Sequence, residues 1–308
     1  MKRTLVVVAA AAGFGVLALS AGVAHSVAVP GGTAITICQT ITQPGAYFLA
    51  KNLTAGLTGH CLVIAADHVT IDFNGYRIKG NGSGDCVRDS GSREGIVLKN
   101  GTVTGCFEGI NLGNTDACKI EEMRVLENNS TGIHVADRCL IKNNVVADND
   151  GTGILGEDRT VILQNVVVDN GSNGFDGINV DDESVIEQNL VQSNGNSDTG
   201  DGHGIHTCES AVIKNNVCSD NADDGIFVAC RGSVIIANSC MNNGDDGIHA
   251  GETAAVHFNS ADNNGGDGFD ISSPCSMTGN VARSNDDCNY NCGCVTETNA
   301  GSGGDCIC

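Results

Sequence analysis

The tetrapeptide Asp-Asp-Gly-Ile occurs twice, at residues 223–226 and 245–248. Adjacent carboxylates of this kind can bind a cation, or share a proton and act as a general acid and base. The position before each Gly that precedes Ile or Phe carries mostly acids, in the order Glu94, Glu108, Thr131, Thr152, Asp176, His203, Asp224, Asp246 and Asp267. The position two residues after the Gly carries Asn111, His134, Leu155, Asn179, His206, Phe227, His249 and Asp270.

These positions recur because the chain is a repeat. From Gly132 to Gly268 the glycines are 21, 24, 27, 21, 22 and 21 residues apart. Two asparagine columns, five residues apart, follow the same period; they are Asn144, Asn165, Asn189, Asn216, Asn238, Asn259 and Asn280, and Asn149, Asn170, Asn194, Asn221, Asn243, Asn264 and Asn285. A sustained period of this length indicates a solenoid of stacked coils.

Each repeat consists of short β-favouring runs separated by Asn, Asp and Gly, with no stretch long enough for an amphipathic helix. A single unit cannot bury its apolar positions, whereas stacked units bury them in one continuous column. Stacking at roughly 4.8 Å per coil predicts one inward row and two asparagine ladders with amide-to-amide hydrogen bonds. The inward row would contain Ile133, Ile154, Ile178, Ile205, Ile226, Ile248 and Phe269.

The Gly-Ile and Asn rows, together with the opening segment from "ITQPGAYFLAKNL" to "CLVIAADHVTIDFNGYRIKG", resemble the right-handed parallel β-helix proteins of the pectin-lyase-like superfamily. The resemblance covers roughly residues 34–285. It implies an all-β, right-handed parallel β-helix of about ten coils, with an N-terminal cap and a Cys-rich C-terminal cap. We expect the β-helix with its N-terminal cap at residues 29–286 and the Cys-rich cap at residues 287–308.

The N-terminus and the composition indicate export. Residues 1–28 have the cationic start, the apolar run and the small residues of a secretory signal peptide, with an uncleaved anchor as the alternative. Sixteen cysteines favour disulfides in an oxidising compartment. A net charge of −21 argues against nucleic acid and anionic membranes as partners. We therefore expect a secreted or cell-surface protein without membrane insertion after signal cleavage.

Some cysteines follow the repeat. Cys208 and Cys230 occupy equivalent positions of neighbouring coils, as do Cys218 and Cys240. Stacked Cα atoms about 4.8 Å apart lie within the range for a disulfide. Each pair is thus predicted to be either a disulfide or two buried free thiols.

Stacked acids repel one another unless a cation, a hydrogen bond or a shared proton intervenes. A calcium ion would be held by Asp223, Asp245 and Asp267, together with Asp224 and Asp246. Carboxylates one coil apart would have about the 5 Å separation of retaining glycosidases, and those two coils apart would approach the roughly 9.5 Å limit of inverting ones. Asp before Gly is also a common turn residue, so a purely structural role stays open.

The acidic column resembles the polygalacturonases, the family-28 glycoside hydrolases of the superfamily. The matching strings are "FDGI" at 175–178, "GHG" at 202–204, "GDD" at 244–246 and "RIK" at 77–79. The resulting hypothesis has Asp224 and Asp246 as acid and base, Asp176 assisting and His203 orienting a carboxylate or a hydroxyl. A polysaccharide would lie against Asn179, His206, Phe227, Arg231 and His249.

Three functions are compatible with this sequence. The first is an exported polysaccharide hydrolase, which requires no cofactor. The second is a non-catalytic extracellular or adhesion β-helix whose acids serve solubility or bind calcium. The third is a calcium-dependent polysaccharide lyase, in which calcium supplies the positive charge that the groove lacks.

Overall fold

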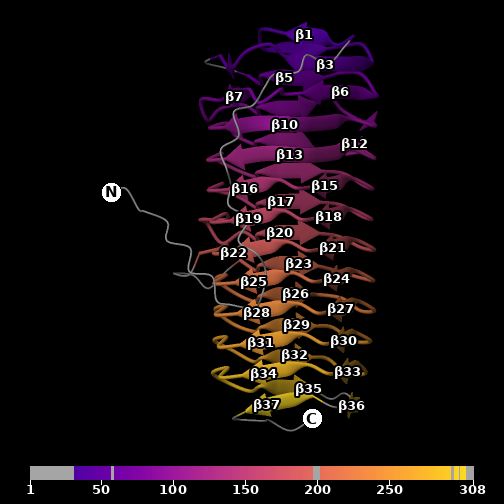
Figure 1. Ribbon diagram of the computed structural model, residues 1–308, viewed down its shortest axis with the longest axis vertical. Coiled ribbons are helices and arrows are strands. Elements are labelled where there is room, and N and C mark those ends of the chain that lie inside the picture. The colour runs from indigo at the N-terminus through magenta and orange to yellow at the C-terminus, as the bar shows by residue number, and fades with distance from the viewer. Residues whose placement is uncertain (1–30, 57–58, 197–201, 293–294, 298, 303–308) are drawn as a thin grey trace, which may run out of the picture.

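The computed structural model describes residues 31–56, 59–196, 202–292, 295–297 and 299–302. The predicted signal peptide at 1–28 and much of the predicted Cys-rich cap lie outside these residues. The described chain is all-β, and Figure 1 shows its short strands stacked along one long axis, from indigo at the N-terminal end to yellow at the C-terminal end. In this part of the chain no helix is long and apolar enough to cross a membrane.

One parallel sheet of 12 strands contributes one strand per coil. Its strands are β2 (Gln39–Ile41), β5 (Leu62–Ile64), β8 (Val87–Asp89), β11 (Ile110–Leu112), β14 (Ile133–Val135), β17 (Ile154–Gly156), β20 (Ile178–Val180), β23 (Ile205–Thr207), β26 (Ile226–Val228), β29 (Ile248–Ala250), β32 (Phe269–Ile271) and β35 (Tyr290–Cys292). The fold is a right-handed parallel β-helix of about eleven turns, which confirms the predicted architecture with one coil more than expected.

A second parallel sheet of 23 strands forms the other two sides of the coils. One stack contains β1 (Thr33–Ile35), β3 (Gly45–Leu49), β6 (Val69–Asp72), β10 (Val97–Thr104), β13 (Lys119–Leu126), β15 (Leu140–Lys142), β18 (Val161–Leu163), β21 (Val185–Glu187), β24 (Val212–Lys214), β27 (Val234–Ile236), β30 (Ala255–His257), β33 (Ser276–Thr278) and β36 (Val295–Glu297). The other contains β4 (Leu53–Thr54), β7 (Arg77–Lys79), the shared β10 and β13, β16 (Val145–Ala147), β19 (Val166–Val168), β22 (Leu190–Gln192), β25 (Val217–Ser219), β28 (Ser239–Met241), β31 (Ser260–Asp262), β34 (Val281–Arg283) and β37 (Ala300–Ser302). The two stacks join because β10 and β13 run through both sides of their coils.

The core consists of the residues that alternate inward along these strands. From β11 to β32, the first and third residues of each strand in the 12-stranded sheet are buried and the middle residue is half-exposed. Ile133 pairs in register with Ile154, and the row continues through every coil to Phe269. The predicted inward row and the predicted outward position two residues after Gly are both confirmed.

Two asparagine ladders hold the corners between coils. In each ladder the side-chain Nδ2 donates to Oδ1 of the asparagine one coil further on, as Asn165 does to Asn189 at 3.1 Å. The same Nδ2 donates to a backbone carbonyl of the preceding coil, and each Oδ1 also accepts a backbone N–H. These buried amides satisfy backbone groups that the turns leave unpaired. The predicted amide-to-amide bonds are confirmed, and Asn128 extends the second column by one coil.

Disulfides join neighbouring coils at four described places, Cys38–Cys61, Cys86–Cys106, Cys118–Cys139 and Cys208–Cys230. The two predicted cysteine pairs behave differently. Cys208 and Cys230 form a disulfide, whereas Cys218 and Cys240 lie side by side in the core as free, buried thiols. Of the two alternatives for each pair, the first therefore holds at one position and the second at the other.

The assignment of Glu94 and Gly95 to the acidic column is wrong. Val87 is the register partner of Ile110, so the coil before Glu108 places Asp85 in the column. Glu94 belongs instead to β9 (Arg93–Glu94), which pairs with β12 (Thr115–Asp116) in a separate two-stranded sheet. A Gly-based search could not find Asp85, because Cys86 stands where other coils have Gly.

We predict that the Asn149→Ala substitution lowers the free energy of unfolding by about 3 kcal/mol. Asn149 accepts the buried N–H of Asn128 and donates to the carbonyl of Val125, and each group left unpaired costs about 1–3 kcal/mol. Denaturation in guanidinium chloride measures the loss. The matched control is Asn129→Ala, because Asn129 is exposed and its removal should cost less than about 0.5 kcal/mol. Equal losses in the two variants would contradict a structural role for the ladder.

Candidate functional site

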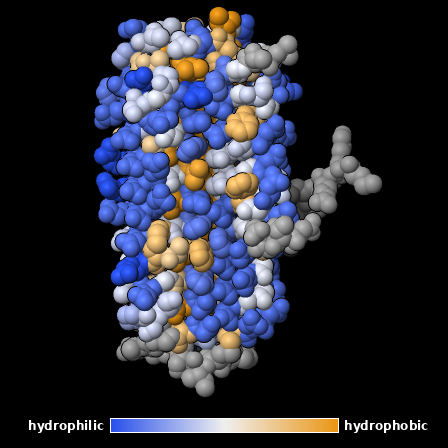
Figure 2. All heavy atoms as spheres, turned by 180° about the vertical axis from the view of Figure 1, so that it is seen from behind, coloured by the Kyte–Doolittle hydropathy of each residue, from blue (hydrophilic) through white to orange (hydrophobic). Residues whose placement is uncertain are grey.

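Most of the predicted site residues lie together on the outer side of the 12-stranded sheet, on the coils of five successive strands from β20 to β32. These are Asp176, Asn179, His203, His206, Asp223, Asp224, Phe227, Asp245, Asp246, His249 and Asp267, with Asp270 beside them. Figure 2 shows one broad face of the stack, which is mostly hydrophilic along its whole length with scattered apolar patches.

Each column carboxylate uses one oxygen to hold the next coil. Oδ1 of Asp176 accepts the backbone N–H of His203 at 2.8 Å, and Oδ1 of Asp224 accepts that of Asp246 at 2.8 Å. The same bond links Asp246 to Asp267 and Asp267 to the N–H of Cys288. These acids thus accept hydrogen bonds from backbone amides, but the bonded amide belongs to the next coil rather than to a local turn.

The second oxygen of three of these carboxylates faces polar side chains. Oδ2 of Asp176 accepts a hydrogen bond of 2.7 Å from the amide of Asn179 and lies 3.2 Å from Nδ1 of His206. Nδ1 of His203 lies 3.5 Å from Oδ2 of both Asp223 and Asp224. These carboxylates therefore combine an inter-coil bond with contacts to histidine or amide groups at the surface.

The third histidine lies between two acids further along the stack. Nδ1 of His249 is 3.4 Å from Oδ2 of Asp246 and 3.2 Å from Oδ2 of Asp270. Sequence reasoning noted Asp270 as an outward residue but gave it no role, because nothing in the sequence indicated that His249 would turn towards it.

Phe227 lies among the three histidines. Its ring is stacked on that of His203, with centroids 4.4 Å apart and planes 6° from parallel. It meets the edge of His206 and is tilted against His249, each at a centroid distance of 5.0 Å. The half-exposed ring gives the polar face one flat apolar element.

The electrostatic environment differs along the column. Burial would raise the pKa of Asp176, but the hydrogen bond and charge of His206 and the N–H of His203 hold it below its usual value. Burial and the neighbouring carboxylate of Asp246 raise the pKa of Asp224 to about 8. Hydrogen bonds to Asp246 and Asp270 raise the pKa of His249 to about 10, although burial opposes the shift. Asp176 and Asp224, two coils apart on either side of His203, thus differ in pKa, and at neutral pH the first favours the ionised and the second the protonated form.

Four overlapping groups on this face place three potential ligand atoms within 4.8 Å of one another. They are Asp176 with His203 and His206, His203 with Asp223 and Asp224, Asp224 with Asp245 and Asp246, and Asp246 with His249 and Asp270. Imidazole and carboxylate together suit Cu²⁺ and Zn²⁺, whereas calcium prefers six or more oxygen ligands. The donor sets that contain histidine therefore fit a transition metal better than calcium.

Three predicted residues stand outside or at the edge of this arrangement. Arg231 lies in the turn after β26, where its side chain is exposed and its carbonyl accepts the N–H of Ser210. Asp245 is exposed beside Asp246. Asp267 accepts the N–H of Cys288 and belongs to none of the four groups that the described residues form.

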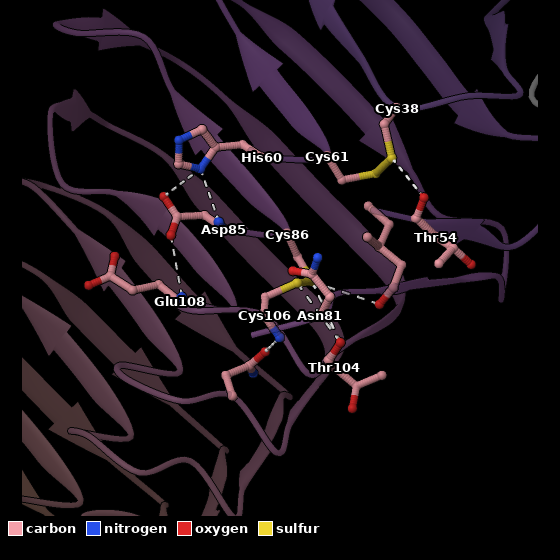
Figure 3. Close-up of a disulfide and its surroundings, with 12 residues drawn as sticks. Cys38, Thr54, His60, Cys61, Asn81, Asp85, Cys86, Thr104, Cys106 and Glu108 are labelled. Carbon is pink, nitrogen blue, oxygen red and sulfur yellow. Dashed lines mark hydrogen bonds and ion pairs between the residues drawn. A yellow bond between two sulfur atoms is a disulfide. The ribbon is translucent and has the colours of Figure 1, made fainter. Parts of the chain in front are cut away.

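The same outer face carries a second polar cluster near the N-terminal end, formed by His60, Asp85, Arg88, Glu108 and His134. Threonines at 131 and 152 and Leu155 separate it from the first cluster. Register places His60 and Asp85 in the acidic column and Arg88 in the outward column. Figure 3 shows His60, Asp85 and Glu108 one below another on successive coils. The sequence could have revealed this cluster if Val87 had been aligned with Ile110, an alignment in which Cys86 takes the place of Gly.

Several solved structures share this fold at low sequence identity. The A-module of Azotobacter vinelandii mannuronan C-5 epimerase AlgE4 is 19% identical over 85% of this chain and 80% of that chain, with a TM-score of 0.55. The AlgE6 A-module from the same organism is 16% identical over 85% and 90%, with a TM-score of 0.57. The Dettilon tailspike protein is 16% identical, and the matched region covers 87% of this chain and 60% of the tailspike, with a TM-score of 0.57.

At these identities the resemblance to solved structures is one of fold. No curated protein sequence matches the chain. The profile of the family described as "Periplasmic copper-binding protein (NosD)" matches residues 51–212, which include the N-terminal polar cluster and the first group of the C-terminal one. The chain therefore belongs to the NosD family of right-handed parallel β-helix proteins.

Proposed function

We propose that this protein is an exported β-helix that binds a divalent transition metal, with copper(II) as the preferred ion, through Asp176, His203 and His206. The observation that carries the proposal is the placement of two imidazoles and one carboxylate within 4.8 Å on adjacent coils. The other three groups offer one imidazole or none. The family description, which names periplasmic copper-binding proteins, supports both the ion and a location outside the cytoplasm.

The chain's own residues fit this role. Oδ1 of Asp176 is engaged by the N–H of His203, which fixes the carboxylate and leaves Oδ2 towards His206. The stacking of His203 on Phe227 fixes the plane of that imidazole. A bound copper ion would supply a strong positive charge on an otherwise acidic face. Nitrogen and oxygen donors favour Cu²⁺ over Zn²⁺ in affinity and do not select Cu⁺, for which thiolate or thioether ligands are preferred.

Metal binding is tested by titrating metal-free protein with Cu²⁺, Zn²⁺ and Ca²⁺ by calorimetry, and by electron paramagnetic resonance of the Cu²⁺ form. We expect one tight Cu²⁺ site whose spectrum shows nitrogen coupling. His206→Gln should weaken Cu²⁺ binding at least tenfold and remove one nitrogen from the spectrum. His257→Gln is the matched control, because His257 lies on β30 in the other sheet. Equal Cu²⁺ affinity in wild type and His206→Gln would contradict the assignment.

A second candidate function is hydrolysis of a polysaccharide, and Phe227 is the observation that favours it. A flat, half-exposed aromatic ring between carboxylates is a surface against which a sugar ring can pack. Asp224 and Asp246 lie one coil apart, near the roughly 5 Å separation of retaining glycosidases. In this hypothesis they act as acid and base, with Asp176 assisting and His203 as orienting group. The names of the structural neighbours include enzymes that modify mannuronan and alginate.

Activity is tested on a panel of neutral and uronate polysaccharides, with and without calcium. If the protein is a hydrolase, Asp246→Asn should lower kcat at least a hundredfold, while Glu122→Gln, at an exposed acid on β13 in the other sheet, should leave activity unchanged. Release of unsaturated sugars only with calcium would favour the lyase alternative. Inactivity of the wild type on the whole panel would contradict both enzymatic readings and leave a non-catalytic binding protein.

A further inference from the structure

One side of the 23-stranded sheet presents two straight columns of outward side chains. In β13, β15, β18, β21, β24 and β27 the first and third residues are half-exposed, and the residue between them is buried. Figure 1 shows β15, β18 and β21 one below another along the axis. Because each strand pairs in register with the next, each outward position continues from coil to coil.

The first of these columns is aliphatic over five successive coils. Its residues are Leu140, Val161, Val185, Val212 and Val234, each the register partner of the next. All five are half-exposed on the outer side of the sheet. A contiguous apolar strip with a polar border is typical of a surface that contacts another protein.

The second column alternates in charge. From β6 to β27 it consists of Asp72, Lys99, Glu121, Lys142, Leu163, Glu187, Lys214 and Ile236. Three acids and three lysines balance in this column, on a chain with a net charge of −21. Two copies of the chain can therefore meet at this face without the repulsion that their net charges produce elsewhere.

The order of these charges is self-complementary about Leu163. Lys142 lies one coil before Leu163 and Glu187 one coil after it; Glu121 lies two coils before it and Lys214 two coils after it. A two-fold axis along the strand that contains Leu163 reverses the order of the coils in a second copy. Lys142 then lies opposite Glu187 of the second copy, and Glu121 lies opposite its Lys214.

Lys142 has no partner of opposite charge within its own chain. Lys99 lies 3.7 Å from Asp72, and Lys214 lies 3.1 Å from Glu187. Lys142 forms no ion pair with any other residue that the structure describes. A carboxylate from a second copy would supply this missing partner.

We propose that two copies of this protein associate through this face as an antiparallel dimer with two-fold symmetry and Leu163 on the axis. Val161 packs against Val161 of the second copy, and Leu140 packs against its Val185. The long Lys and Glu side chains reach across the ~10 Å spacing of two packed sheets. The apolar contacts supply most of the affinity and the ion pairs set the register, because exposed ion pairs add little free energy.

Other arrangements of the two copies are less favourable. An axis moved by one coil would place Lys142 or Glu187 opposite itself. A parallel arrangement would set the charged column of one copy against the aliphatic column of the other. An axis midway between β21 and β24 keeps the aliphatic contacts, but it places Lys142 opposite His257. The axis at Leu163 pairs all four of the nearest charges.

This dimer would leave the outer side of the 12-stranded sheet uncovered, because the proposed contacts all lie on the other sheet. The proposal therefore goes beyond the metal and hydrolase functions and does not depend on either of them.

The association is tested by sedimentation equilibrium over a wide range of protein concentrations. We expect wild type to dimerise, and Lys142→Glu to raise the dissociation constant at least tenfold, because it sets two carboxylates against each other. Adding Glu187→Lys to this variant restores an opposite-charge pair and should return the affinity to at least the wild-type level. Lys79→Glu makes the same change at an exposed position on β7 and should leave the dimer unchanged.

Cross-linking tests the position of the axis. Gln164 is exposed directly after Leu163, so the two copies of Gln164→Cys should react readily with a short bifunctional maleimide. Ala237→Cys is the matched control, at the equivalent exposed position three coils further on. In the proposed dimer its two copies are six coils, roughly 29 Å, apart along the axis, and they should cross-link no more than wild type does.

Four results would overturn the proposal: a monomeric wild type at every concentration, equal dimerisation of wild type and Lys142→Glu, no recovery in the double variant, or equal cross-linking of the two cysteine variants. Circular dichroism checks that each variant is folded. If Lys142→Glu does not fold, the comparison of Gln164→Cys with Ala237→Cys decides the question.

Discussion

Hydrogen bonding between coils is the interaction on which every other feature depends. The backbone of each strand bonds to the equivalent strand one coil away, so residues at the same phase of the repeat lie directly over one another. The asparagine ladders extend this pairing through the corners, where strand pairing stops. A site on this molecule is consequently a column of side chains at fixed spacing along the axis, rather than a set of residues gathered by loops.

The carboxylate column shows how one residue can serve the fold and the site together. Oδ1 of Asp176, Asp224 and Asp246 completes the backbone bonding of the next coil, whereas Oδ2 meets a histidine. The structural bond fixes the orientation of the carboxylate, so the outer oxygen is held in place before any ligand binds. Asparagine is the informative replacement at these positions, because its Oδ1 can keep the inter-coil bond while the charge is removed.

Much of the architecture could be predicted from the sequence because a solenoid converts sequence period directly into spatial contact. The Ile row, the asparagine columns and the outward phase of His206 and Phe227 all followed from the period alone. The predicted acidic column was wrong only at the coil of β8. Cys86 stands there in place of the Gly that marks the column in the other coils, and Asp85 was therefore missed. Spacing also could not decide which cysteines bond, because Cys208 with Cys230 and Cys218 with Cys240 occupy equally matched positions.

The direction in which side chains point was the second feature that could not be predicted from the sequence. The period says that Asp176 and His203 are neighbours, but not that His203 turns towards Asp223 and Asp224 while His206 turns towards Asp176. That choice depends on Phe227, whose ring fills the space between the imidazoles and stacks on one of them. Arg231 lies apart from the other predicted site residues for a related reason, since turns between the sheets do not keep the strict outward phase of the strands.

The two polar clusters differ in charge, so the two ends of the face are not equivalent. The N-terminal cluster combines Arg88 with His60 and two acids, whereas the C-terminal cluster contains acids and imidazoles without Lys or Arg in its outward column. An uncharged interval at Thr131, Thr152 and Leu155 separates them, so each cluster keeps its own electrostatic character over a distance longer than the ~8 Å screening length at physiological salt. A ligand at the N-terminal cluster would therefore meet a fixed positive charge at Arg88, whereas a ligand at the C-terminal cluster would meet acids and imidazoles.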